Sequence, residues 1–249
     1  MDDKIIQLYE WISEASNIVF FGGAGVSTES GVPDFRSETG LYSAKEVYGY
    51  PPEYLISHTM LEKNPELFFK YYKENLVPKN VKPNKAHIAL AKLEEKGKVK
   101  AVVTQNIDGL HQMAGSKNVY EVHGGNSRQY CRHCGEKYSL DYIFDEKNNK
   151  DGVPICKKCG GIVRPDVVLY EEMLDRDTVD GAVSAIAKAD LLIVGGTSLA
   201  VYPAASFVNY FRGKHLVLIN LSGTPYDKKA DLCIHDKIGE VLGAYCDMK

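Results

Sequence analysis

The chain has 249 residues, 44% of them hydrophobic and 25% charged, and its formal net charge is −3 at pH 7. That length is enough for one large core, or for one core and a smaller lobe, and the slightly acidic balance argues against a general nucleic-acid-binding protein. The first residues, Met1-Asp2-Asp3-Lys4, lack the basic and apolar regions of a signal peptide, so we expect a cytoplasmic protein.

Helical and strand patterns alternate along most of the sequence. In chain order they predict a helix at about 4–15, a buried strand at 18–21, a helix at 85–96, strands at 101–104, 119–122 and 167–170, a helix at 176–189, a strand at 191–194, a helix at 203–211 and a strand at 216–219. Short apolar strands that alternate with helices predict an α/β fold, with a doubly wound, Rossmann-like parallel sheet covered on both faces. The uncharged run at 191–211 is interrupted by glycines and a proline, which argues against a membrane span.

Two insertions interrupt this alternation. The first, 37–80, includes an aromatic-rich helical stretch, and the second, 128–164, contains four cysteines. We expect both to stand together as a small lobe of helices and a zinc ribbon, with a cleft between it and the Rossmann-like domain. That domain would be formed by 1–36, 81–127 and 165–249.

The four cysteines form two pairs with C-x-x-C spacing, Cys131 with Cys134 and Cys156 with Cys159. Each such turn presents two thiolates, and zinc prefers four soft ligands at the corners of a tetrahedron. The 21 residues between the pairs are slightly more than is usual for a zinc ribbon. Disulfides or buried thiols are the alternatives, but the spacing favours one structural zinc ion held by all four cysteines.

Polar or glycine-rich segments follow most of the predicted strands. Because the carboxyl ends of parallel strands meet at one edge of a sheet, these segments should converge on one rim, where open α/β sheets bind ligands. In chain order they are 22–27, 105–108, 123–125, 195–198 and 220–222.

The first of these segments, Gly23-Ala24-Gly25-Val26-Ser27, lets backbone amides approach a pyrophosphate. Alone it is weak support for a nucleotide site, because a tight structural turn is the alternative. The third glycine of the dehydrogenase fingerprint is absent, and no second strand with a terminal acidic residue follows about twenty residues later. A plain dehydrogenase is therefore disfavoured.

The glycine turn is followed by Gly31-Val32-Pro33-Asp34-Phe35-Arg36, then by Thr104-Gln105-Asn106-Ile107-Asp108, and then by His123-Gly124. With the two cysteine pairs, these motifs resemble the sirtuins in order and spacing, and the likeness to compact bacterial members runs from the glycine turn to about Lys237. The resemblance implies an NAD-dependent protein lysine deacylase with an NAD-binding Rossmann-like domain. NAD would be a co-substrate, and the zinc ion would be structural.

The resemblance also implies which residues form the site. Those that would hold NAD are Gly23, Ala24, Gly25, Thr28, Phe35 and Arg36 in the first loop; Gln105, Asn106, Ile107 and Asp108 around the ribose and nicotinamide; and Thr197, Ser198, Asn220, Leu221, Lys237 and Ile238 along the phosphates and adenosine. Asn106 would also contribute to catalysis by orienting the ribose.

His123 would be the general base. In the family mechanism the acyl oxygen of the modified lysine attacks the ribose carbon, and His123 activates a ribose hydroxyl that carries the acyl group away as O-acyl-ADP-ribose. Histidine suits this step because its unperturbed pKa is about 6.5. A histidine packed at a strand end is the alternative for His123, and a helix cap is the alternative for Asp108. The remaining histidines are expected to be structural or exposed: His58, His87, His111, His133, His215 and His235.

The segment expected to pair with a peptide substrate departs from the family pattern. Sirtuins usually have Phe-Gly-Glu there, whereas this chain continues as Val167-Val168-Leu169-Tyr170-Glu171-Glu172 without the glycine. An extended peptide could still pair through backbone groups alone. The tyrosine and arginine pair of the desuccinylase subgroup is also absent, so acetyl or another uncharged acyl group is expected.

Two other functions stay open. One is ADP-ribosyl transfer to a protein through the same NAD pocket, and the other is a zinc-ribbon module that binds nucleic acid or a protein. The 128–164 insertion has eight Lys or Arg and five Asp or Glu, an excess too small to favour nucleic acid. We expect a monomer that acts on proteins or peptides bearing acyl-lysine, with no membrane partner and no specific nucleic-acid partner.

Overall fold

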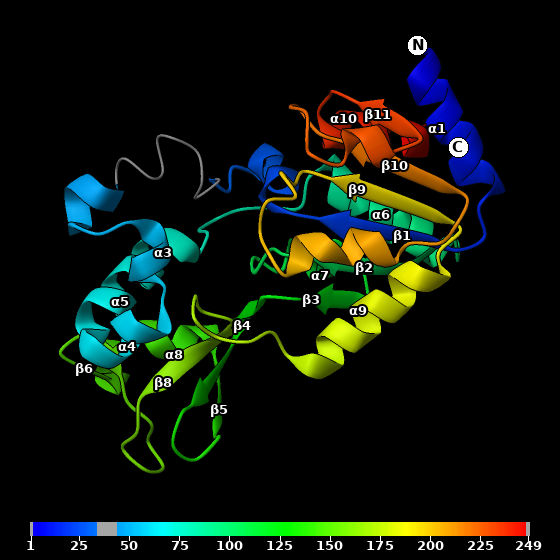
Figure 1. The fold of residues 1–249 in the computed structure, drawn as a ribbon. Coiled ribbons are helices and arrows are strands. Elements are labelled where there is room, and N and C mark those ends of the chain that lie inside the picture. The colour runs from blue at the N-terminus through cyan, green and yellow to red at the C-terminus, as the bar shows by residue number, and fades with distance from the viewer. Residues whose placement is uncertain (1, 34–43, 248–249) are drawn as a thin grey trace.

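A six-stranded parallel sheet forms the centre of the larger lobe (Figure 1). The computed structural model describes residues 2–33 and 44–247. The strands lie in the order β11-β10-β9-β1-β2-β3. Their bounds are Ile18–Gly22 for β1, Val99–Thr104 for β2, Val119–Glu121 for β3, Leu191–Gly195 for β9, His215–Ile219 for β10 and Leu232–Ile234 for β11. The doubly wound parallel sheet predicted from the sequence is confirmed.

Helices cover both faces of this sheet. On one face Ile18, Phe20 and Val102 pack in a core that also contains buried residues of α1 (Asp3–Glu14), α6 (Lys85–Glu95) and α10 (Ile238–Asp247). On the other face Val19 and Phe21 pack with α9 (Arg176–Lys188) and the 3-10 helix η5 (Ala204–Tyr210). The strands are apolar throughout because successive side chains enter opposite cores, as expected for a sheet buried on both faces.

Local sequence sets where these helices begin. The carboxylate of Asp2 accepts a hydrogen bond from the backbone N–H of Lys4 at the start of α1, and that of Asp175 accepts one from Thr178 N–H at the start of α9. Asn84 caps α6 through Ala86 N–H, and its amide also donates to the carbonyl of Val26. The last contact ties the beginning of α6 to the glycine turn after β1.

The strand register sets the position of the rim. β1 pairs in parallel with β2 on one side and with β9 on the other, so Gly22 lies opposite both Thr104 and Gly195. The chain passes from β1 to β2 and β3 on one side and later returns to β9 on the other. The end of β1 is therefore a topological switch point, where the loops on its two sides diverge and leave a crevice.

The small lobe contains the helical insertion and the cysteine-bearing insertion (left and lower part of Figure 1). Its helices are α3 (Pro52–Leu55), α4 (His58–Lys63), α5 (Pro65–Tyr71), the π-helical turn Tyr72–Leu76 and α8 (Leu140–Phe144). Its sheets are β5-β4-β8 (Lys137–Ser139, Gly124–Cys131 and Val163–Val167) and β6-β7 (Asn149–Lys150 and Val153–Pro154). Phe68, Phe69 and Tyr72 from the helices share one core with Cys131 and Cys156. The residue boundaries of the two domains stay a prediction.

The structure corrects some of the predicted elements. The strand expected at 167–170 is wrong, because β8 spans Val163–Val167 and belongs to the antiparallel small sheet. β8 contains Pro165, which the strand tolerates because it lies at the edge of its sheet. The segment 203–211 forms a 3-10 helix rather than an α-helix, and β4 and the three-residue β11 were not predicted.

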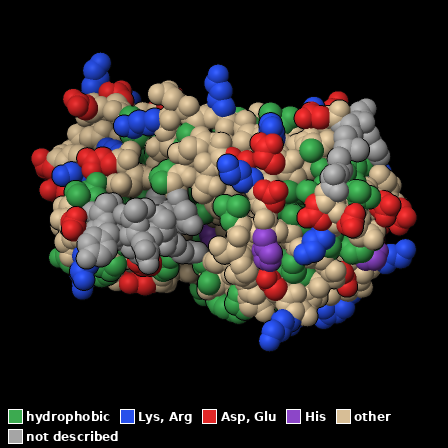
Figure 2. Space-filling view, turned by 90° about the horizontal axis from the view of Figure 1, so that it is seen from above, with side chains coloured by type: hydrophobic (Ala, Val, Ile, Leu, Met, Phe, Trp, Pro, Cys, Tyr) green, Lys and Arg blue, Asp and Glu red, His purple; other side chains and the backbone are tan. Residues whose placement is uncertain are grey.

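No helix within the described residues is both long and apolar enough to span a membrane. On the face drawn in Figure 2, basic side chains are scattered among acidic ones, and the coloured atoms form no basic patch. A basic stripe of the kind that follows a nucleic-acid backbone is thus missing from the part of this face that the structure describes.

Two buried histidines pack behind the loop that follows β2. The rings of His87 in α6 and His111 in α7 (Leu110–Met113) meet edge to face, with centroids 4.7 Å apart, and Phe20 lies 6.0 Å from His111. Among the described residues neither nitrogen of His111 has a hydrogen-bond partner. Burial lowers the pKa of His87 to about 4, against an opposing effect of Asp108, and burial next to His87 lowers the pKa of His111 to about 3.

These pKa values predict a loss of stability in mild acid. Below pH 6.5 both histidines become protonated in the unfolded chain but stay neutral in the folded protein. The free energy of unfolding that the protein has above pH 6.5 is therefore lost as the pH falls toward 4, by about 1.4 kcal/mol per pH unit for each histidine. His111→Phe should reduce this slope by about that amount in urea unfolding curves measured between pH 6.5 and 4.5. The control is His235→Phe, which replaces an exposed histidine instead of a buried one. An unaltered slope in His111→Phe would contradict neutral burial.

Candidate active site and metal centre

The four predicted zinc ligands converge in the small lobe. The sulfur atoms of Cys131, Cys134, Cys156 and Cys159 all lie within 4.8 Å of one another. The Sγ atoms of Cys131 and Cys159 are 3.4 Å apart, and those of Cys134 and Cys156 are 3.7 Å apart. A disulfide needs about 2.05 Å, whereas a tetrahedral ion with Zn–S bonds of about 2.3 Å needs sulfur atoms about 3.8 Å apart. The donor set therefore fits a structural zinc ion.

The two cysteine turns have the same backbone geometry. Gly135 N–H donates to the carbonyl of Cys131 at 2.9 Å, and Gly160 N–H donates to that of Cys156 at 2.9 Å. Both glycines have φ in the left-handed region, at 72° and 75°. Each turn thereby places its two sulfur atoms on the same side, where the metal would sit.

A cavity of about 550 Å³ lies where the rim of the parallel sheet meets the small lobe. The sequence-predicted residues that line it are Gly23, Ala24, Gly25, Gln105, Asn106, Ile107, Asp108, His123, Thr197 and Ser198. Residues of the small lobe complete it, among them Pro52, Glu53 and Ile56, together with 167–172. Segments far apart in the sequence thus share one cleft.

Close backbone packing shapes the glycine turn. Gly25 N–H donates to the carbonyl of Gly196 at 2.8 Å, and a Cβ on Gly25 would lie 2.8 Å from Gly196 Cα. Gly196 itself has φ of +59°. Any side chain at these two positions would push the loops after β1 and β9 apart. Thr28 Oγ donates to the carbonyl of Gly25, so its hydroxyl is engaged within the turn.

The segment after β2 is held by a hydrogen-bonded chain that includes Ser27. The hydroxyl of Ser27 donates to Asp108 at 2.7 Å and accepts from the amide of Asn106 at 3.0 Å. The other carboxylate oxygen of Asp108 accepts from Leu110 N–H at 2.9 Å, although the N-cap residue of the following helix is Gly109. Gln105 donates from its amide to Thr197 Oγ at 3.1 Å. These contacts fix the polar side chains along one wall of the cleft.

His123 lies just beyond β3, half-buried in the cleft. Its Nδ1 is 2.9 Å from the carbonyl oxygen of Gln105. Because a carbonyl only accepts, Nδ1 carries the proton, and in the neutral ring the lone pair is on Nε2. The backbone fixes His123 as well, since Val168 N–H donates to its carbonyl at 2.9 Å. This arrangement is that of an oriented base.

The residues predicted for the adenosine side are less closely grouped. Asn220 supports the rim, since its side-chain oxygen accepts from Thr197 N–H at 2.8 Å. Leu221, Lys237 and Ile238 do not line the cavity; Leu221 is 69% exposed, and Ile238 is buried in the core under the sheet. Phe35 and Arg36 lie outside the described residues.

Ser27, Gly196 and the 201–203 segment also line the cleft, although they were not predicted to be site residues. Gly196 could have been predicted from the sequence, since it directly follows a predicted strand. Ser27 was indicated only by being a polar residue within the glycine turn. His87 and His111 were expected to be structural or exposed, and both are buried.

The chain is similar to known proteins over nearly its whole length. A model of the Sir2 family matches residues 23–203. The NAD-dependent protein deacetylase of Clostridium perfringens is 62% identical over 248 residues, which cover 99% of this chain and 100% of that protein. That of Clostridium acetobutylicum is 58% identical over 240 residues, which cover 96% and 97%. A solved structure of Sir2 with a p53 peptide and NAD⁺ has a TM-score of 0.86 at 37% identity, covering 100% of this chain and 98% of that one.

Removal of the metal should unfold the small lobe. Two of the four sulfur ligands, from Cys131 and Cys156, belong to its core, and a structural zinc site contributes on the order of 10 kcal/mol to folding. A chelator should therefore release one zinc per chain, expose 128–164 to proteolysis and abolish activity together. A zinc-free protein that resists the protease and retains full activity would contradict this.

Proposed function

The chain belongs to the Sir2 family, and from that premise we propose that it is an NAD-dependent protein deacetylase in which His123 is the general base. The observation that carries the proposal is the orientation of His123 within the cleft. Its Nδ1–H is held by the Gln105 carbonyl, so the neutral ring has its lone pair on Nε2. The glycine turn and the small lobe supply the opposite sides of the same cavity.

The NAD side of the cleft is formed by the rim of the parallel sheet. Gly23, Ala24 and Gly25 would bring backbone close to the phosphates, with Thr197 and Ser198 opposite. Asn106 and Asp108 would hold the ribose, and both are hydrogen-bonded to the hydroxyl of Ser27. Gln105 and Ile107 would border the nicotinamide. Phe35 and Arg36 in the first loop, and Thr28, Asn220, Leu221, Lys237 and Ile238, complete the proposed NAD-binding set. When bound, NAD supplies the ADP-ribose that accepts the acyl group as nicotinamide is lost.

The residues of this chain then have two tasks. His123 accepts the proton of a ribose hydroxyl on Nε2, which makes that oxygen able to take the acyl group. Asn106 holds the ribose in the matching orientation through an amide that Ser27 fixes. Over the whole reaction acetyl-lysine, NAD and water give lysine, nicotinamide and O-acetyl-ADP-ribose.

The acyl-lysine would enter from the small-lobe side. The cavity wall there is largely apolar, with Ile56, Ile107, Val167 and Leu169. An apolar wall suits the aliphatic part of a lysine and a short uncharged acyl group, and it disfavours a carboxylate at the end of the acyl chain. Acetyl is the expected group.

We also propose that the protein acts as a cytoplasmic monomer on acyl-lysine proteins, without a nucleic-acid partner. The interspersed charges in Figure 2 support the last point. Of the alternatives, ADP-ribosyl transfer would use the same NAD pocket but would not need an oriented base at His123. A zinc-ribbon binding module would need neither.

The proposal predicts a specific loss of activity in His123→Ala. Wild type incubated with an acetyl-lysine peptide and NAD should release deacetylated peptide, nicotinamide and O-acetyl-ADP-ribose, which mass spectrometry detects. Loss of the general base should lower the deacetylation rate by about 10² to 10⁴-fold. The exposed His235 supplies a matched control, and His235→Ala should leave the rate close to wild type.

The products distinguish the alternatives. Labelling of the protein by ADP-ribose without deacetylation would favour the transferase, and no consumption of NAD with any peptide would favour the binding module. Undiminished deacetylation in His123→Ala would overturn the role of that residue.

A further inference from the structure

Residues 168–172 form a wall segment between His123 and the helical insertion. At one end Val168 N–H donates to the carbonyl of His123 at 2.9 Å. Further along, Tyr170 forms a parallel bridge with Ser57: Tyr170 N–H donates to Ile56, and its carbonyl accepts from His58 N–H. The whole segment lines the cleft. Movement at its Glu171 end would change the shape of the small-lobe side of the cleft, while the Val168 bond holds the other end at His123.

Glu171 has an uncommon backbone conformation within this segment. Its φ is +76°, in the left-handed region that favours glycine. Glycine is also the residue that the family pattern would put there. A glutamate pays a conformational cost at this φ and persists only where surrounding contacts hold it.

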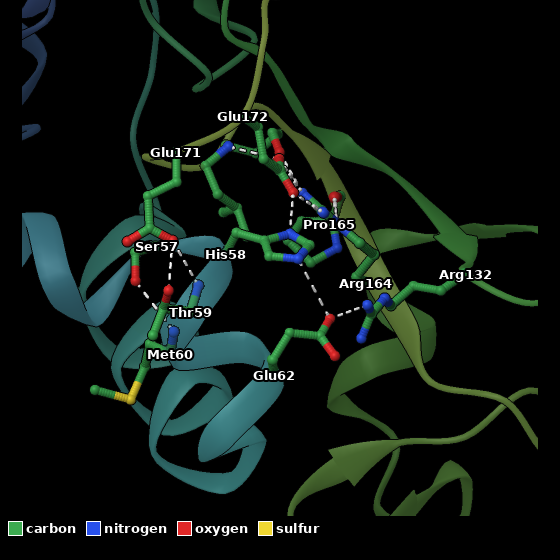
Figure 3. A network of polar contacts seen from close by, with 12 residues as sticks. Ser57, His58, Thr59, Met60, Glu62, Arg132, Arg164, Pro165, Glu171 and Glu172 are labelled. Atoms are coloured by element: carbon green, nitrogen blue, oxygen red, sulfur yellow. Dashed lines mark hydrogen bonds and ion pairs between the residues drawn. The ribbon is translucent and has the colours of Figure 1, made fainter.

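The carboxylate of Glu171 supplies such contacts. One oxygen accepts hydrogen bonds from the backbone N–H of Thr59 at 2.9 Å and from its hydroxyl at 2.7 Å (Figure 3). Thr59 is the second residue of α4, where backbone N–H groups have no partner within the helix. The two bonds hold the pKa of Glu171 below its usual range, so the group is charged at neutral pH. Glu171 thereby joins the wall segment to the first turn of α4.

Glu172 anchors the other side of the segment. Its carboxylate accepts from both terminal nitrogens of the buried Arg164, at 2.5 and 3.0 Å, and from Leu169 N–H at 2.9 Å. His58 Nδ1 lies 3.1 Å away. Burial raises the pKa of Glu172, but these hydrogen bonds outweigh it and lower the pKa to about 2. The Glu171 carboxylate contacts Thr59 in α4, whereas the Glu172 carboxylate contacts both Arg164 in β8 and His58 at the start of α4 (Figure 3).

We propose that Glu171, through Thr59, is a positioning residue for the acyl-lysine peptide, holding the wall segment in the conformation that receives it. This rests on the proposed function, because it takes the rim side of the cleft to be filled by NAD and leaves the small-lobe side for the peptide. Where a glycine would adopt the left-handed backbone conformation without strain, Glu171 is held in it by the hydrogen bonds of its carboxylate to Thr59. Its loss should weaken peptide binding while leaving the NAD side unchanged.

A set of variants separates the contact from the backbone conformation. Glu171→Ala loses the contact and keeps the unfavourable φ, Glu171→Gly loses the contact and relieves φ, and Glu171→Gln keeps an oxygen that accepts from Thr59. We expect the peptide KM to rise about tenfold in the first two variants and about twofold in Glu171→Gln, with the KM for NAD and kcat within about twofold of wild type. Glu171→Gly should melt at a higher temperature than Glu171→Ala despite its equal KM.

Two further variants serve as controls. Thr59→Val removes only the hydroxyl donor and should give an intermediate peptide KM. Glu95 is an exposed glutamate on α6, and Glu95→Ala should give the wild-type peptide KM. An unchanged peptide KM in Glu171→Ala, or KM values that follow melting temperature rather than the contact, would overturn the proposal. So would an equal rise in both KM values.

Direct binding separates this proposal from the proposed function. The affinity of each variant for a fluorescent acetyl-lysine peptide, measured by anisotropy without turnover, should fall in the same order as KM rises. If wild type binds the peptide without consuming NAD, the proposed function fails, while the affinity series still decides the role of Glu171. If wild type binds no peptide, both are overturned.

Discussion

The rim of the molecule depends on the register of three parallel strands. Because Gly22 at the end of β1 lies opposite both Thr104 and Gly195, the loops after β1, β2 and β9 begin at the same level. The backbones of Gly25 and Gly196 then approach to hydrogen-bonding distance, which leaves no room for a side chain between them. Ser27 can therefore reach Asn106 and Asp108, and Gln105 can reach both Thr197 and His123. A shift of one residue in the β1–β2 pairing would displace His123 relative to the glycine turn, and a shift in the β1–β9 pairing would displace Thr197.

The small lobe is connected to this rim through its own core. The zinc-binding cysteines pack with the aromatic residues of the helical insertion, and β8 leads from that core to the wall segment. Arg164 in β8 holds Glu172, and Val168 holds the backbone of His123. Tyr72 donates its hydroxyl to Asn126, whose backbone N–H donates to Ile107 in the cleft. A structural metal held by the four cysteines would thus support both the small-lobe side of the cleft and the position of His123.

Much of this architecture could be predicted from the sequence, because it rests on local patterns. The buried strands of the parallel sheet are short apolar runs, and the cysteine spacing specifies the metal site directly. Composition alone could not reveal the strand that contains Arg164 and Pro165. A strand tolerates proline at the edge of a sheet, and the position of this strand in its sheet is known only from the structure. Burial of His87 and His111, and the contact of Glu171 with Thr59, join residues distant in sequence. The absence of glycine at position 171 was visible in the sequence, but what compensates for it was not.

A crystal structure with an acetyl-lysine peptide and an NAD analogue whose nicotinamide bond cannot break would test the assignment of the cleft most directly. We expect the pyrophosphate against Gly23–Gly25 and the loop after β9, and the acetyl-lysine along Val167–Leu169. A ribose hydroxyl should lie within hydrogen-bonding distance of His123 Nε2. A ribose remote from His123, or a peptide bound away from the wall segment, would contradict a single cleft in which His123 serves both substrates.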